Sequence, residues 1–378
     1  MSKPHPGNVH LHQILVSPLL GGAGLVAVRL AAAARRRAIR CTAWVPGDGI
    51  AAETLARDHV PRQFYDLEGL KGHLTGRLAA SGRMWCGLAS ARRAIAHVHN
   101  PIVFGLVRPI LRAAGLRTVV HFQLEPSAEE IAWAVKRPPS HIITCARYMV
   151  GPIRAALDER HASVPVTAVP NAIDLERFQP GDREAARARL GLPTRNFVMI
   201  TLANLAPHKG QMTGLLALRR LLDRQVQAEY WLVGQDRTPG AEYESRLRAR
   251  AAELGLADRV RLLGFRQDVP DLLQAADAFV LASTHEGLPL SVLEAQASGV
   301  PVVASTIPGI AEVVDDETTG FLVPADDAEG YADRLTALFS NQDLRARLAQ
   351  AAARRVTQEY SWSRFEERIF DIYASVAA

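Results

Sequence analysis

The stretch "DAFVLASTHEGLPLSVLEAQASGVPVVAS", residues 277–305, contains the alternation of elements that decides the fold. Two short apolar runs, "AFVLAS" and "PVVAS", are typical of buried strands. A loop over residues 284–289 and a helical segment separate them. A strand, a helix and a second strand in this order predict parallel strands joined by a crossover helix.

The same alternation runs through the whole chain of 378 residues. Strand-like runs in the first half are "VHLHQILVS", "RCTAWVP", "IAHVHN", "RTVVHFQ", "HIITCA" and "PVTAVPN"; those in the second half are "NFVMITL", "YWLVG", "RVRLLGF", "AFVLAS", "PVVAST" and "GFLVP". Amphipathic stretches such as 212–226, 241–254 and 328–339 separate the runs. Two such series predict an α/β protein with two Rossmann-like β/α/β lobes.

The boundary between the lobes follows "VPNAIDLERFQPGD". We expect an N-terminal lobe over residues 1–170, a linker over 171–195 and a C-terminal lobe over 196–359. Residues 360–378 place apolar side chains on one face of a final helix.

The composition is that of an ordinary soluble protein, with 48% hydrophobic and 22% charged residues. Three cysteines without metal or redox spacing indicate buried thiols in a reducing compartment. The N-terminus loosely imitates a signal peptide, but Pro18 and the pair Gly21-Gly22 interrupt its apolar segment. No stretch reads as a transmembrane helix. We therefore expect a cytoplasmic protein.

Charge is distributed unevenly along the chain. Residues 1–170 hold 21 Lys and Arg against 10 Asp and Glu, whereas the rest hold 23 against 29. A basic N-terminal half suits an anionic acceptor, or peripheral contact with anionic lipid at the inner leaflet of the membrane. An arginine-rich background composition explains the asymmetry equally well. The chain has few aromatic residues among its basic ones, so nucleic acid is not an expected partner.

Two glutamates in the opening stretch differ in how easily they are explained. Ser291 and Glu294 have the spacing of a capping box, which requires no ligand. Glu286 precedes Gly287 in a loop at the carboxyl end of a strand, where ligands bind in such sheets. The loop and the following helix N-terminus also present backbone N–H groups that suit a phosphate.

Three other segments are candidates for ligand contact. A strand runs into Gly21-Gly22-Ala23-Gly24, which suits either the close approach of an anionic ligand or a tight turn without one. In "HFQLEP", two-residue alternation places His121 and Gln123 on one side of a strand, where a lone histidine is as often structural. Lys209, in "LAPHKG", suits a phosphate as a point charge, although a lysine at a turn is usually only solvated.

Taken together, these segments resemble the retaining glycosyltransferases of family 4. The resemblance rests on residues 276–314, which look like the family's glutamate-x7-glutamate block, and on "VPNAIDLERF", "LAPHKG", "WLVG", "LLGF" and "YSW" in the family's order. It implies the GT-B architecture, with two lobes facing a central cleft and a C-terminal helix, 360–378, that returns to the N-terminal lobe.

The resemblance also implies roles for single residues. Glu286 would contact the donor sugar at the reaction centre, Lys209 would neutralise the diphosphate, and Glu294 would bind the ribose. The remaining donor contacts would come from Gly22, Asn204, Phe265, Arg266, Gly287, Leu288 and Leu290. Gly21, Gly22, His121, Gln123 and Asn171 would line the acceptor side of the cleft, with His121 or Gln123 near the sugar and His121 counted as catalytic.

One departure from the family concerns the phosphate loop. Asn204 stands where the family usually has an arginine, so one bidentate phosphate contact is missing. His208, His285, Arg147 or Arg266 are the candidates to replace that charge.

The resulting interpretation is a transferase that moves a sugar from a nucleotide sugar to an acceptor hydroxyl with retention. We expect a UDP-sugar rather than a GDP-sugar, and a glycan, lipid-linked or small-molecule acceptor, as in the synthesis of envelope polysaccharide or glycolipid. No Asp-x-Asp pair stands out, so neither a metal nor another cofactor is expected. The alternatives are a related GT-B enzyme such as a nucleotide-sugar epimerase, and a non-catalytic nucleotide-sugar-binding protein.

Overall fold

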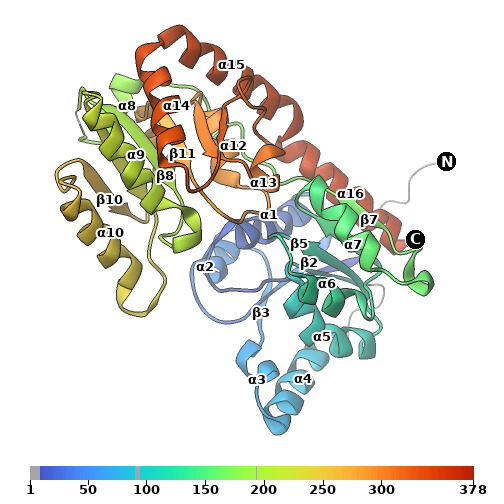
Figure 1. Ribbon diagram of the computed structural model, residues 1–378. Coiled ribbons are helices and arrows are strands. Elements are labelled where there is room, and N and C mark those ends of the chain that lie inside the picture. Colours follow the sequence, from blue (N-terminus) through green and yellow to red (C-terminus); the bar gives the residue numbers. More distant parts are fainter. Residues whose placement is uncertain (1–8, 90–93, 193) are drawn as a thin grey trace. The chain divides into compact units, whose positions relative to one another are not determined.

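The computed structural model describes residues 9–89, 94–192 and 194–378 (Figure 1). The chain forms two compact units: unit 1 comprises residues up to Asn171 together with Ser363–Ala378, and unit 2 comprises Ala172–Trp362. Of the linker expected over residues 171–195, Asn171 therefore clusters with unit 1 and the rest with unit 2.

Unit 1 is built on a seven-stranded sheet in the order β3-β2-β1-β4-β5-β6-β7, with every pair parallel. The strands are β1 (His10–Ile14), β2 (Arg40–Val45), β3 (Arg62–Phe64), β4 (Ala94–Val98), β5 (Arg117–Phe122), β6 (His141–Thr144) and β7 (Val166–Ala168). All six predicted runs are strands. The edge strand β3 was not predicted, because its three residues are exposed and give no apolar run.

The helices of unit 1 begin where the sequence supplies the right local chemistry. They are α1 (Gly22–Arg36), α2 (Ile50–Arg57), α3 (Leu67–Lys71), α4 (Leu74–Leu88), α5 (Pro101–Ala113), α6 (Ala128–Val135), α7 (Val150–Ala156) and α16 (Trp362–Ala377). Asn100 caps α5 by accepting from two backbone N–H groups, and Pro101 occupies the first helical position. Ser127 and Glu130 form a reciprocal capping box at α6.

The last helix, α16, packs against unit 1, as expected for the C-terminal segment. It lies beside β7 in Figure 1, where the Arg368 guanidinium donates to the Ala168 carbonyl at 2.8 Å. Phe365, Ile369 and Tyr373 are buried beneath it. The amphipathic pattern therefore predicted this helix correctly, and the apolar face of α16 packs against the rest of unit 1.

Unit 2 is built on a six-stranded parallel sheet in the order β10-β9-β8-β11-β12-β13. The strands are β8 (Phe197–Leu202), β9 (Ala228–Val233), β10 (Val260–Gly264), β11 (Ala278–Leu281), β12 (Val302–Ser305) and β13 (Phe321–Val323). All six had been predicted. The helices are α8 (Arg183–Arg189), α9 (Gln211–Asp223), α10 (Glu242–Glu253), α11 (Val269–Ala275), α12 (Leu290–Ala297), α13 (Pro308–Ala311), α14 (Ala328–Ser340) and α15 (Gln342–Glu359).

A buried ion pair joins α8 to the sheet of unit 2. Arg187 Nη2 lies 2.8 Å from Asp277 Oδ2, and the same carboxylate oxygen accepts from the Val198 backbone N–H at 2.8 Å. The Arg187 guanidinium also donates to the carbonyls of Ala275 and Thr194. These bonds satisfy both charges, which burial otherwise makes costly.

Two local expectations are wrong. The N-cap of α12 is Pro289 and no side chain caps this helix, so Ser291 and Glu294 do not form a capping box. The cause is that α12 begins at Leu290, which puts Ser291 inside the first turn. Cys41 and Cys145 are buried as expected, but Cys86 on α4 is exposed. In the described part of the chain, every helix falls short of the length or apolarity that crossing a bilayer requires.

Candidate functional site

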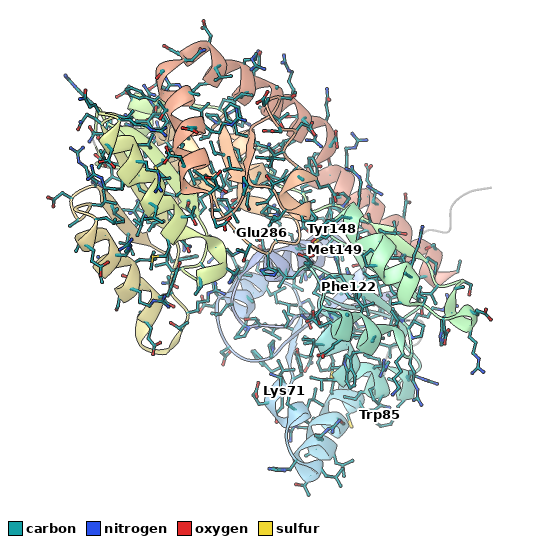
Figure 2. All side chains as sticks on the ribbon, in the orientation of Figure 1. Lys71, Trp85, Phe122, Tyr148, Met149 and Glu286 are labelled. Atoms are coloured by element: carbon teal, nitrogen blue, oxygen red, sulfur yellow. The ribbon has the colours of Figure 1, made fainter. Side chains whose placement is uncertain are left out.

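The carboxyl edge of the unit 2 sheet contains the best-defined polar site. The strand order turns at β8, because the chain adds β9 on one side of it and β11 on the other. Such a switch point is where open parallel sheets bind ligands. The loops after β8 and β11 carry Lys209 and Glu286, so the fold brings together the two residues that the sequence singled out. Figure 2 labels Glu286 on the second of these loops.

Lys209 and Glu286 form a tight, largely buried pair. Lys209 Nζ lies 2.7 Å from Glu286 Oε1, and Ser283 Oγ donates to the same oxygen at 2.8 Å. The Glu286 side chain is 7% exposed and that of Lys209 is 17% exposed. A charged pair at such a position is much less screened than one at the surface. The lysine ammonium has three donor hydrogens, so one bond to Glu286 leaves capacity for other acceptors.

Backbone packing fixes the two loops against each other. Gly210 has φ +71°, and a Cβ atom there would lie 2.0 Å from the Ala282 carbonyl oxygen. Only glycine fits such a position, in both conformation and space. The Thr284 N–H donates to the His208 carbonyl at 2.9 Å. The Lys209-Gly210 sequence therefore seats the lysine loop directly on the glutamate loop.

The Glu286 loop is supported from its other side by α13. A Cβ atom at Gly309 would lie 2.1 Å from the Gly287 carbonyl oxygen, so the two backbones touch. Leu288 is buried, and Leu290 is the first residue of α12. Gly287, Leu288 and Leu290 thus lead directly from the buried pair into the N-terminus of a helix.

Glu294 lies farther along α12 than the sequence indicated. It is the fifth helical residue and is half-buried. Its role at a ribose remains a prediction, but the competing interpretation as a capping residue is removed.

Two of the four residues expected to compensate for Asn204, Arg266 and His208, do not supply the missing charge, and the same role for Arg147 and His285 stays a prediction. Asn204 is exposed, and its backbone carbonyl accepts a hydrogen bond from Gln211 Nε2 at 2.9 Å. Arg266 is engaged by Asp268, with Nε 2.8 Å from Oδ1. Burial and the adjacent Lys209 lower the pKa of His208 from 6.5, although Glu286 opposes the shift. Neither residue supplies an unpaired positive charge at neutral pH.

The loop after β10 carries Phe265 and Arg266, predicted to lie near a nucleotide base. Phe265 is largely exposed, and Gly264 before it has φ +65°. β10 lies two strands from β8 in the sheet. An exposed aromatic ring at this edge suits stacking with a base.

In unit 1, the predicted glycine loop is the start of α1. Gly21 is the N-cap and Gly22 the first helical residue, without a side-chain cap. Gly24 needs to be glycine for packing, because a Cβ atom would lie 2.9 Å from the Leu19 carbonyl oxygen. A Cβ atom at Gly21 would meet nothing within 4 Å. Internal packing therefore explains Gly24 but not Gly21.

A buried polar cluster, formed by Gln13, His97, His99, His121, Gln123 and Tyr373, lies between the sheet of unit 1 and α16. Tyr373 Oη lies 2.6 Å from His97 Nδ1 and accepts from Gln13 Nε2 at 2.9 Å. His99 Nε2 lies 2.7 Å from Gln13 Oε1, and Gln123 Nε2 lies 3.3 Å from both His99 Nδ1 and His121 Nδ1.

The prediction that His121 faces a ligand is not met within unit 1. Its ring is 0% exposed and stacks against Phe365 of α16. Two-residue alternation did place His121 and Gln123 on one face of β5, but α16 covers that face, which the sequence of the strand could not reveal. Gln123 follows the end of β5 and is slightly exposed. Asn171, at the end of unit 1, is buried and its N–H donates to the Cys145 carbonyl at 3.2 Å.

The three histidines are the candidate metal ligands among the described residues. One nitrogen from each of His97, His99 and His121 lies within 4.8 Å of the others. Nitrogens around a zinc ion lie roughly 3.3 Å apart, given Zn–N bonds of about 2.0–2.1 Å. The His97 and His99 rings are stacked at 4.1 Å rather than converging on a point. Burial lowers the pKa of His121 to about 3, and burial with the neighbouring imidazoles lowers the pKa of His97 well below 6.5. The cluster is therefore a stack of neutral, hydrogen-bonded rings.

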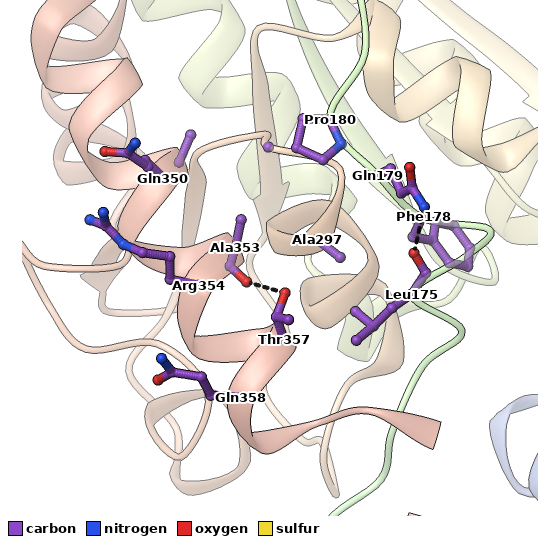
Figure 3. Close-up of a pocket in the computed structure, with 12 residues that line it drawn as sticks. Leu175, Phe178, Gln179, Pro180, Ala297, Gln350, Ala353, Arg354, Thr357 and Gln358 are labelled. Atoms are coloured by element: carbon purple, nitrogen blue, oxygen red, sulfur yellow. Dashed lines mark hydrogen bonds between the residues drawn. The ribbon is translucent and has the colours of Figure 1, made fainter. Parts of the chain in front are cut away.

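An apolar pocket of about 730 Å³ lies elsewhere in unit 2 (Figure 3). Its walls include Leu175, Phe178, Pro180, Ala297 and Ala353. Ala297 ends α12, whereas Glu286 precedes the start of that helix, so the pocket lies toward the amino ends of the strands. This is not the edge at which parallel sheets bind ligands.

Several residues that shape the site escaped the sequence analysis. Ser283 is two residues beyond β11 and its role is visible only through its bond to Glu286. Gly309 is distant in sequence from the loop that it supports. Gln13 lies on β1, whereas His97 and His99 lie on β4 and directly after it, and the sheet brings these two segments together; the spacing of "HVHN" on one strand face was the available signal.

Comparison with known proteins places these features in a family. Residues 182–355 match the family described as glycosyl transferases group 1. D-inositol 3-phosphate glycosyltransferase from Stackebrandtia nassauensis is 30% identical over 319 residues, which is 83% of this chain and 69% of that protein. The protein of the same name from Saccharomonospora viridis is 37% identical over 219 residues, 56% of this chain and 51% of that protein.

Among solved structures, Anabaena Alr3699/HepE in complex with UDP and glucose has a TM-score of 0.86 and 23% identity, covering 97% of this chain and 99% of that one. This likeness shows the fold, with two Rossmann-like parallel-sheet units of the GT-B kind. Against the first curated relatives, the chain spans only 51%, 66% and 47% of their length.

Proposed function

The chain belongs to the group 1 glycosyltransferases, and we propose that it transfers a sugar from a nucleotide sugar to an acceptor hydroxyl with retention of the anomeric configuration. Relatives named as glycosyltransferases and the UDP complex of a structural neighbour support the nucleotide-sugar donor. The resemblance to family 4 supports retention.

The Lys209–Glu286 pair is the observation that carries this proposal. It joins the two strands at the switch point of unit 2, is largely buried, and combines a cation with a carboxylate at 2.7 Å. A cation there suits a diphosphate leaving group, and a carboxylate suits sugar hydroxyls and a developing positive charge at the anomeric carbon. An ordinary surface ion pair offers neither burial nor this position.

The proposed donor contacts are assigned to the two loops, to α12 and to the loop after β10. Lys209 neutralises the diphosphate, and the backbone N–H groups of Gly287, Leu288 and Leu290, at the start of α12, donate to phosphate and sugar oxygens. Glu286 contacts the transferred sugar, and Glu294 the ribose. Phe265 and Arg266 lie at the edge where the base, uracil in our proposal, would stack.

The reaction follows from these positions. As the bond between the anomeric carbon and the phosphate oxygen lengthens, Lys209 and the amides of α12 stabilise the charge on the leaving diphosphate. The acceptor hydroxyl attacks the same face, and its proton passes to the leaving phosphate oxygen. The positive charge of Lys209 does the work that a metal ion would otherwise do, so the proposed transfer is metal-independent.

Acceptor binding is assigned to unit 1. Gly21 and Gly22 at the start of α1 allow close approach, and Gln123 is better exposed than His121 for contact with a sugar. The excess of basic residues in this part of the chain supports an anionic or lipid-linked acceptor, at the inner face of the cytoplasmic membrane.

A second candidate function is donor binding without turnover. Asn204 favours it, because it replaces an arginine expected at the diphosphate while Arg266 is already paired. This alternative predicts that a nucleotide sugar binds and is not consumed.

Nucleotide release separates the two. We expect release of UDP from one of a panel of UDP-sugars and GDP-sugars when glycan, lipid-linked and small-molecule acceptors are supplied. Lys209→Met should lower release at least tenfold, whereas Glu253→Gln, at the far end of α10, should leave it unchanged. Calorimetric binding of a donor with no release by the wild type in any combination would overturn the transferase proposal.

A further inference from the structure

The helix α4 carries an exposed apolar stripe. Leu74 is 72% exposed, Leu78 is 65% exposed and Trp85 is 43% exposed. At about 100° per residue, these three side chains lie within roughly 40° of one another around the helix. Scattered surface leucines are ordinary, but large apolar residues aligned on one face of a helix mark a surface that binds something.

The α4 stripe is not the face by which the helix joins its own unit. Ala80, Met84 and Leu88 are the buried residues of α4. They lie roughly 100° around the helix from the stripe. The helix therefore has two apolar faces, one used for packing in unit 1 and one left open.

The position of α4 suits contact with a broad surface. In Figure 1, α3 and α4 project from the body of unit 1 beyond the edge strand β3, and Figure 2 shows Lys71 and Trp85 on this projection. Lys71, Gly72 and His73, which join the two helices, are all exposed.

The charges around the stripe favour an anionic partner. α4 contains Arg77 and Arg83 and no acidic residue. The two acidic side chains of the preceding turn are already paired, Asp66 with Arg83 at 3.1 Å and Glu68 with Lys71 at 2.9 Å. Arg77 is exposed and has no ion pair within the described residues. An apolar stripe flanked by arginine, with a tryptophan on it, is the pattern of a helix that lies in a membrane interface.

We propose that the α4 stripe docks unit 1 onto an anionic lipid bilayer, with Leu74, Leu78 and Trp85 entering the headgroup region and Arg77 contacting lipid phosphates. The helix lies along the surface. Its length of 15 residues and its two arginines do not allow it to span the bilayer.

A second copy of the chain suits the surface less well. A stable protein interface buries roughly 800 Å² on each partner, more than two leucines and one half-exposed tryptophan provide. In a symmetric pairing of this face, the exposed Arg77 of each copy would also approach that of the other and repel it.

The proposed function explains only why membrane binding would be useful, because an enzyme with a lipid-linked acceptor gains from being held at the bilayer. The binding itself requires no donor and no turnover. Failure of the glycosyltransferase proposal would therefore leave the lipid measurement interpretable.

The test is sedimentation of the purified chain with vesicles of phosphatidylcholine alone and of phosphatidylcholine mixed with phosphatidylglycerol. We expect binding to the anionic vesicles that weakens in high salt. Leu74→Ser with Leu78→Ser should weaken it at least about tenfold, because two apolar side chains no longer leave water. Arg77→Ser should weaken it roughly fivefold.

The matched control is Ile102→Ser, which removes a half-exposed apolar residue of unit 1 on α5 and should leave vesicle binding unchanged. Because all these positions are exposed, circular dichroism should show folded variants. The proposal is overturned if the wild type does not sediment with anionic vesicles, or if the double variant binds as well as the wild type. It is equally overturned if light scattering shows a dimer that the double variant converts to a monomer.

Discussion

The two sheets of the molecule share a parallel topology and differ in what fills their centres. In unit 2, the central strands β8, β11 and β12 read "FVMITL", "AFVL" and "VVAS" and are almost wholly apolar. In unit 1, β1, β4 and β5 read "HLHQI", "AIAHV" and "RTVVHF", with buried glutamine and histidine. The same fold thus tolerates either kind of core, although His97 Nε2, His121 Nε2 and Gln123 Oε1 of the unit 1 cluster are buried without a hydrogen-bond partner among the described residues.

The difference lies in where each unit places its polar groups. Unit 2 keeps its central strands largely apolar and holds charged groups at the carboxyl edge, in the Lys209–Glu286 pair, and next to α8, in the Arg187–Asp277 pair. A further buried carboxylate, Glu229 on β9, accepts from Thr194 and Asn196. Unit 1 spreads them under α16, in a cluster that Tyr373 ties to the sheet. We infer that unit 2 is organised for charged chemistry at one edge and unit 1 for holding the returning helix.

Replacing Glu286 by alanine tests the edge of unit 2 and should have the largest effect. We expect roughly a thousandfold loss of turnover, because the carboxylate proposed to contact the reacting sugar is removed and Lys209 loses its partner. Glu294→Ala should instead weaken donor affinity about tenfold. Steady-state kinetics and calorimetry with the active donor measure both. Equal, small effects of the two variants on turnover would contradict the assigned roles.

Replacing Arg187 by leucine tests the buried pair of unit 2. Asp277 Oδ2 and the carbonyls of Ala275 and Thr194 would lose their shared donor, although Arg183 and Arg345 still contact Asp277 Oδ1. The free energy of unfolding should therefore fall by about 1–3 kcal/mol. The matched control is Arg189→Leu, two residues away, whose pair with Asp271 is half-exposed and should matter by less than about 1 kcal/mol. Urea unfolding, monitored by amide hydrogen exchange in unit 2, measures the stability of both variants. Equal losses of stability in the two variants would show that burial of the ion pair is not decisive.

Acid should destabilise unit 1 more than unit 2. The folded pKa of His121 is depressed to about 3, and those of His97 and His99 are also lowered, so the unfolded chain binds more protons below its ordinary pKa of about 6.5. Stability is therefore full above about pH 6.5 and falls as pH decreases, by about 2 kcal/mol for His121 alone at pH 5.

Urea unfolding at pH 7.5 and pH 5, with each unit followed by a pulse of amide exchange, measures the difference. Loss confined to unit 2, or equal in both units, would contradict the assignment. The groups facing the three rings are Gln13, Gln123 and Tyr373, with His141 nearby, and none of them is a carboxylate that could offset the added charge.

The smallest effect is expected from Tyr373→Phe. The change removes the hydroxyl shared by Gln13 and His97 and should lower the stability of unit 1 by roughly 1–2 kcal/mol. Tyr331→Phe in unit 2, which removes one longer bond of 3.3 Å to the Leu281 carbonyl, should cost less. A larger loss of stability in Tyr331→Phe than in Tyr373→Phe would contradict the view that side-chain hydrogen bonds matter more in the polar core of unit 1 than in the apolar core of unit 2.

Much of the fold was predictable because short local sequence patterns determine most of its strands and helices. Twelve of the thirteen strands in the described part of the chain appear as short runs rich in apolar residues, since a strand buried on both faces is mostly apolar. The edge strand β3 lacks that constraint and was missed. The start of α12 was misplaced because Ser291 and Glu294 satisfy the capping-box pattern, while the helix begins two residues earlier, with Pro289 as its N-cap.

The candidate site was predictable only in part. The sequence by itself determined that Glu286 and Lys209 follow strands of parallel sheets, and hence that both lie at the ligand-binding edge. Only the tertiary structure decided that they pair at 2.7 Å, because this depends on β8 and β11 being neighbours and on the contact of Gly210 with Ala282. It also decided that His121 is buried, since the helix that covers it lies more than two hundred residues away in the chain. Local sequence fixes which face a side chain occupies, and only long-range packing fixes what lies against that face.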